Sequence, residues 1–77
     1  MFYIYSGPVL IDPEGFTSFP VRTTAMTHVR GDAFSYADER MTRLDPSAMW
    51  HPEHADGYSV CWVNDDGTHF VEIEMPA

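Results

Sequence analysis

The sequence predicts an α+β fold, in which an antiparallel sheet of four to five strands packs one face against a single helix at about residues 35–44. Residues 58–64 and 68–75 alternate between apolar and polar side chains on either side of a glycine turn, as the strands of a β-hairpin do. Residues 35–44 begin with a capping serine and carry acidic residues early and arginines late, as a helix does. A chain of 77 residues can bury one core, so a single domain, 1–77, is expected.

The N-terminal part of the chain is expected to supply the early strands. Phe2 to Tyr5 is aromatic and β-branched and predicts a short strand. Asp12-Pro13-Glu14-Gly15 has the residues that a type I turn prefers, so the chain should reverse there. Residues 21–30 alternate with period two, which favours a strand, but apolar residues from Val21 to Val29 also recur every fourth position and fit a helix. Both interpretations stay open.

The helix at residues 35–44 should begin at Ser35 and end before Pro46, because a residue that precedes proline is disfavoured in helical geometry. Its buried stripe would consist of Ala37, Met41 and Leu44. Residues 45–55 contain two prolines and are expected to be irregular, with at most one helical turn.

The register of the C-terminal hairpin follows from keeping its two faces consistent. A two-residue Asp66-Gly67 turn makes one face apolar, with Trp62 opposite Val71 and Val60 opposite Ile73. A three-residue loop would bring carboxylates to the apolar face, where unpaired charges are costly. In the chosen register the outward face carries Glu72 and Glu74 opposite Cys61 and Ser59, next to an exposed Val63–Phe70 pair.

Composition narrows the class of partner. The chain has twelve acidic residues, four arginines and no lysine, so the formal net charge is -8. Such a charge repels nucleic acid and anionic membranes and attracts basic clefts on proteins. The chain is 44% apolar, which is too apolar for a disordered acidic tail. The lone cysteine excludes an internal disulfide and favours the cytoplasm, and the N-terminal residues are typical of neither a signal peptide nor a membrane span.

The acidic side chains are the first candidate for a binding site. Rows of carboxylates can imitate phosphates and enter a basic groove on a protein partner, although acidity also serves solubility. Trp50 is expected either to close the core as a lid or to anchor a partner. The predicted partner-binding residues are Glu72, Glu74, Asp65, Asp66, Asp12 and Glu14, with the apolar Val63, Phe70 and Trp50.

Metal binding and catalysis are weaker candidates. His51 and His54, with Cys61, could supply zinc ligands, but Pro52 discourages the regular helix that would align both imidazole rings, and structural zinc sites normally use more than one cysteine. Cys61 could pair with a histidine base, yet no glycine-rich loop is present to form an oxyanion hole. We therefore expect no metal, no cofactor and no enzymatic activity.

As a whole, this small, acidic, tryptophan-containing chain without a catalytic motif resembles the inhibitor proteins that phages encode, such as anti-CRISPR proteins and DNA mimics. The resemblance implies stoichiometric inhibition, in which the protein occupies a nucleic-acid-binding or subunit-binding surface of a host nucleoprotein complex. Direct nucleic-acid binding is not expected, because the four arginines form no basic run. The alternatives are an accessory homodimeric domain that pairs through Val63 and Phe70, and a small metal- or thiol-dependent enzyme.

Overall fold

The computed structural model describes residues 1–19 and 22–76 and confirms the α+β class. A five-stranded antiparallel sheet has the strand order β4-β1-β7-β6-β5, and β2 and β3 form a separate two-stranded ribbon. The elements in chain order are β1 (Phe2–Pro8), β2 (Leu10–Ile11), β3 (Thr17–Ser18), β4 (Thr23–Thr27), α1 (Arg30–Leu44), β5 (Trp50–Ala55), β6 (Ser59–Asn64) and β7 (His69–Glu74).

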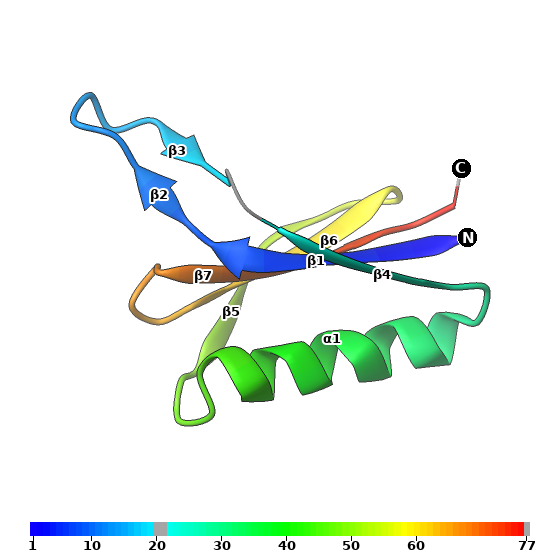
Figure 1. Ribbon diagram of the computed structural model, residues 1–77. Coiled ribbons are helices and arrows are strands. Elements are labelled where there is room, and N and C mark those ends of the chain that lie inside the picture. Colours follow the sequence, from blue (N-terminus) through cyan, green and yellow to red (C-terminus); the bar gives the residue numbers. More distant parts are fainter. Residues whose placement is uncertain (20–21, 77) are drawn as a thin grey trace.

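The helix and the ribbon lie on opposite sides of the sheet. In Figure 1, α1 runs below the sheet and the β2–β3 ribbon rises from the other side. The core lies between α1 and the sheet, where Ile4, Val71 and Ile73 are almost fully buried together with Ala33 and Ala37 of the helix. Because the two buried helix residues are alanines, the helix can approach the central strands closely. It packs on β7, β1 and β4.

The helix begins five residues earlier than predicted, at Arg30, so Ser35 is not its cap. Val29 takes the N-cap position in extended geometry and makes no side-chain capping hydrogen bond. The Ala33 backbone N–H donates to the Val29 carbonyl at 3.0 Å, and the Ala33 side chain is fully buried. Burial of the added turn therefore outweighs its poor local signals, which include Gly31. The helix ends at Leu44, as predicted.

The open question at residues 21–30 is resolved in favour of a strand over Thr23–Thr27, followed by the start of the helix. Ala25 pairs with Ile4 of β1 and packs against the core, as the period-two pattern predicted. Val29 is exposed, contrary to that pattern, because the chain turns there into α1. Val21 lies outside the described residues.

The predicted hairpin register is confirmed, with Trp62 opposite Val71 and Val60 opposite Ile73. The turn itself differs from the prediction. The Gly67 N–H donates to the Asn64 carbonyl at 2.9 Å, so a four-residue loop joins the strands instead of a two-residue turn. Both loop lengths are even and therefore place the same side chains on the same face.

The prediction of an irregular segment at residues 45–55 is wrong for its second half, which forms β5. Pro52 is tolerated because β5 is an edge strand, with a register shift between Pro52 and His54. The predicted turn at residues 12–15 is present, and its Gly15 N–H donates to the Asp12 carbonyl at 2.9 Å. Within the described ranges, no helix is both long and apolar enough to cross a lipid bilayer.

Candidate functional site

The ribbon encloses a cleft against the sheet face that points away from α1. We call this cleft, of about 460 Å³, the outer cleft. Its floor comes from β6 and β7, one wall from β5 and the other from the ribbon and its flanking residues. It is lined by Val9, Ile11, Thr17, Phe19, Glu53, His54, Cys61, Val63, Gly67 and Glu72.

The Val63–Phe70 pair is not exposed as predicted. Phe70 is only 2% exposed and Val63 is half-buried. The ring of Phe19, just after β3, packs on the Phe70 ring with a centroid distance of 4.4 Å. The ribbon thus covers this patch, and the exposed apolar surface lies on the ribbon instead, where Ile11 is 65% and Phe16 is 71% exposed.

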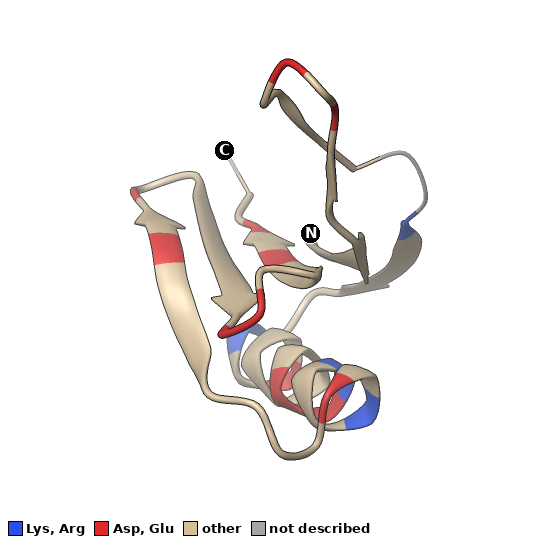
Figure 2. Ribbon diagram, turned by 90° about the vertical axis from the view of Figure 1, so that its left-hand side faces the viewer, with Lys and Arg blue, Asp and Glu red and all other residues tan. Residues whose placement is uncertain are grey.

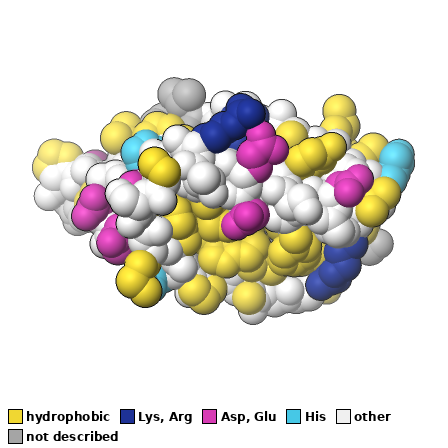
Figure 3. Space-filling model, turned by 90° about the horizontal axis from the view of Figure 1, so that it is seen from below, with side chains coloured by type: hydrophobic (Ala, Val, Ile, Leu, Met, Phe, Trp, Pro, Cys, Tyr) yellow, Lys and Arg dark blue, Asp and Glu magenta, His cyan; other side chains and the backbone are white. Residues whose placement is uncertain are grey.

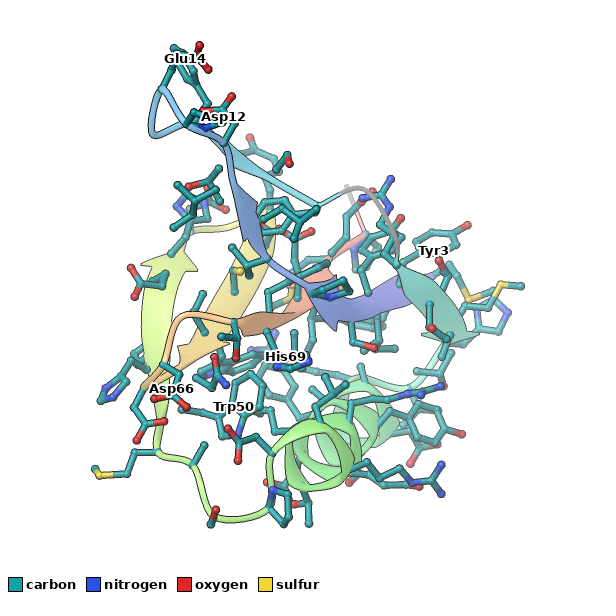
Figure 4. The ribbon with its side chains drawn as sticks, turned by 60° about the vertical axis from the view of Figure 1, so that its left-hand side comes forward. Tyr3, Asp12, Glu14, Trp50, Asp66 and His69 are labelled. Atoms are coloured by element: carbon teal, nitrogen blue, oxygen red, sulfur yellow. The ribbon has the colours of Figure 1, made fainter. Side chains whose placement is uncertain are left out.

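The six predicted acidic residues fall into three groups and do not form one row. Glu72 and Glu74 share the outward face of β7, where Glu74 is exposed and Glu72 is half-buried at the outer cleft. Figure 4 shows the other two groups apart, with Asp12 and Glu14 at the tip of the ribbon and Asp66 away from that tip, in the β6–β7 loop. Acidic segments accordingly mark the ribbon, the sheet and the helix in Figure 2.

Most of this negative charge has no partner within the protein. In the described part of the chain, only Glu39 and Asp56 lie within ion-pair distance of a basic side chain, at 2.7 Å from Arg43 and 2.8 Å from His54. Two arginines lie over aromatic rings, Arg22 at 4.5 Å from the Tyr5 centroid and Arg30 at 5.3 Å from that of Phe34. The acidic surface is therefore largely uncompensated.

The candidate metal ligands do not converge. His54 lies opposite Cys61 across the β5–β6 pair and is held by Asp56, while His51 lies opposite Val63. Among the described residues, the one set of three possible ligands in close proximity is Asp45, Asp65 and Asp66, which contains none of the predicted ligands.

Asp56 has a structural role in the β5–β6 turn. Its Oδ1 accepts hydrogen bonds from the Tyr58 and Ser59 backbone N–H groups, at 2.6 and 2.9 Å. These bonds, together with His54, hold the pKa of the Asp56 carboxyl below its ordinary value. The His54 side chain therefore takes part in this turn through its hydrogen bond with Asp56.

Cys61 is poorly suited to thiolate chemistry. Burial of the side chain, together with Glu72 and Glu53 nearby, raises the pKa of its thiol to about 11. The thiolate is the reactive and metal-binding form, so it is scarce at neutral pH.

We expect Cys61 to react with a disulfide reagent about tenfold more slowly in the folded protein than in the unfolded chain at pH 8, since a roughly 100-fold lower thiolate population is partly offset by its greater nucleophilicity. The folded-state rate should keep rising with pH toward 11. Stopped-flow absorbance with and without denaturant measures both rates. Equal rates, or a plateau near pH 8, would show that the thiol is activated.

A second pocket lies on the helix side, where α1 leaves β6 and β5 partly uncovered. We call this space of about 350 Å³ the tryptophan pocket. Figure 3 shows hydrophobic side chains gathered at the centre of this face, with acidic side chains beside them. The pocket is lined by Asp38, Met41, Thr42, Asp45, Pro46, Ala48, Trp50 and Trp62.

Trp50 serves as a lid on the core, whereas its role as an anchor for a partner stays a prediction. It packs against the core while remaining half-buried, and it forms part of the pocket wall between β5 and the end of α1 (Figure 4). Its indole Nε1 is buried and has no hydrogen-bond partner in the described structure.

Asn64, which the sequence analysis did not single out, organises this end of the molecule. It is 3% exposed, and its Nδ2 donates to Asp45 Oδ2 at 3.0 Å. Its Oδ1 accepts from the Thr68 and His69 backbone N–H groups, at 2.8 and 3.0 Å. Asn64 thereby ties the β6–β7 loop to Asp45 and brings Asp65 and Asp66 close to the pocket. An asparagine directly before Asp-Asp-Gly was the available signal.

No protein-family model matches the chain, and comparisons with curated proteins and with solved structures give no match either. Its function is therefore inferred from its own charge and geometry.

Proposed function

We propose that this protein is a non-catalytic inhibitor that binds a basic nucleic-acid-binding or subunit-binding surface of a protein partner, in the manner of an anti-CRISPR protein or a DNA mimic, and that it acts in the cytoplasm. The observation that carries the proposal is uncompensated negative charge around an exposed apolar ribbon. The lone cysteine supports a reducing compartment.

The ribbon and outer cleft combine the features of a protein interface. Leu10, Ile11 and Phe16 are large apolar side chains that are more than half exposed, and such clusters mark interaction sites. Glu14 at the ribbon tip and Glu53 on the cleft wall are both exposed. An apolar centre with a charged rim is the usual anatomy of an interface, and the charge would steer a basic partner onto it.

The alternatives fit this surface less well. Self-association through Val63 and Phe70 is opposed because Phe70 is only 2% exposed beneath Phe19. It would also bring together two bodies that each carry a net charge of -8, which repel each other. Thiol catalysis is disfavoured by the raised pKa of Cys61. A monomer that binds a basic partner would pair its carboxylates with basic groups and bury its exposed apolar side chains.

The test is capture of host proteins on the immobilised protein, followed by competition. We expect a retained nucleic-acid-binding complex that is released by oligonucleotides, and association that slows between 50 and 300 mM salt as the Debye length falls below about 10 Å. The protein alone should not retard DNA or RNA in a gel. Retention that is insensitive to both salt and nucleic acid would overturn the proposal, as would a dimer in sedimentation at the working concentration.

A further inference from the structure

The tryptophan pocket lies on the other face of the sheet from the outer cleft and has its own chemistry. Two tryptophans, Trp50 and Trp62, are the aromatic residues of its lining, and two carboxylates, Asp38 and Asp45, also contribute to it. None of the lining residues is basic. We propose that this pocket binds the side chain of an arginine that a protein partner presents.

The negative charge of the pocket determines that its ligand should be a cation. Besides the two carboxylates in the lining, Asp65 and Asp66 place their oxygens within 4.8 Å of those of Asp45. Arg43, in the last turn of α1, is paired with Glu39 and is not part of the lining. A cationic group in the pocket would therefore gain from several carboxylates and meet no repulsion from the walls.

The aromatic walls favour a guanidinium over a metal ion or an ammonium group. Tryptophan is the strongest cation–π partner among the aromatic residues. A guanidinium is planar, stacks on such rings, is weakly hydrated and can donate two parallel hydrogen bonds to one carboxylate. A volume of about 350 Å³ is at the small end for ligand pockets and suits one side chain.

The identity of the partner as a basic protein rests on the proposed function, but binding of the arginine side chain does not. Arginine is the residue that nucleic-acid-binding surfaces use most for bidentate contacts. The tryptophan pocket would then provide a second point of attachment on the face opposite the outer cleft. It can be tested on the isolated protein, without the partner.

The experiment is a titration of ¹⁵N-labelled protein with N-acetyl-arginine amide, followed by NMR. We expect saturable shifts of the Trp50 and Trp62 indole N–H signals, with an affinity in the millimolar range. The citrulline analogue has the same shape without the charge and should cause no such shifts, and the lysine analogue should bind more weakly. Equal shifts with citrulline, or arginine shifts that spread over Glu14, Glu53 and the other acidic residues and spare the indoles, would overturn the proposal.

Two variants distinguish binding in the tryptophan pocket from attraction by the overall negative charge. Asp38→Asn should weaken arginine binding about two- to fivefold, the contribution of an exposed ion pair. Asp38 is exposed and its described hydrogen bond uses only its backbone carbonyl, so the fold should persist. Asp32→Asn removes the same charge from the first turn of α1, outside the pocket lining, and should leave the affinity unchanged. Equal effects of the two variants would contradict a specific site. Failure of partner capture with intact arginine binding would remove only the proposed function.

Discussion

Reversing Glu14 and Glu53 to lysine is expected to weaken partner binding by about 100-fold or more, because each new positive charge repels the basic surface that the carboxylate attracted. Both residues are exposed: Glu14 lies at the tip of the ribbon (Figure 4), and Glu53 lines the outer cleft from β5. The Glu14 contribution to the turn comes from its backbone N–H, which donates to Asp12 Oδ1. The fold should therefore be retained, and surface plasmon resonance measures the affinity.

The matched control reverses Asp32 and Glu39, which changes the net charge by the same amount. Both residues are exposed on α1, on the side of the sheet away from the outer cleft, and neither lines the outer cleft or the tryptophan pocket. The control should slow association through loss of long-range steering but preserve most of the affinity. If the two double variants weaken binding equally, net charge alone is responsible and the outer cleft is not the interface.

Replacing Ile73 with alanine is expected to destabilise the fold by about 2–5 kcal/mol, as truncation of a buried aliphatic side chain does. Ile73 is completely buried on the central strand β7, and its neighbours across the sheet are Ile4 and Val60. A domain of this size has a total stability of roughly 4–12 kcal/mol. The variant should thus lose a large part of its free energy of unfolding, as measured by urea denaturation.

Glu74→Ala provides the control for this prediction on the same strand. Glu74 is exposed on the opposite face, so its removal should change the free energy of unfolding by less than about 0.5 kcal/mol. Comparable losses for the two variants would mean that the faces of β7 are assigned incorrectly and that the core does not lie where the structure places it.

The register of the C-terminal hairpin and the turn at residues 12–15 were determined by the sequence itself. At residues 58–75, alternation with period two and the cost of burying carboxylates left one register, which places Trp62 opposite Val71. At residues 12–15, the preferred turn residues alone predicted the reversal. These features depend on neighbours within a few residues, so local chemistry is sufficient to specify them.

The start of the helix, the edge strand and both pockets were decided by tertiary structure. Burial of Ala33 extends α1 past Gly31, and pairing with β6 makes Pro52 part of a strand. Phe70 is covered because Phe19, some fifty residues away along the chain, folds back onto it. Trp50 and Asp38 likewise line the same pocket only because the fold brings the start of β5 near α1. Such contacts are stabilised by apolar surface that is buried between segments distant in the sequence. No local sequence pattern indicates which of these segments will come into contact.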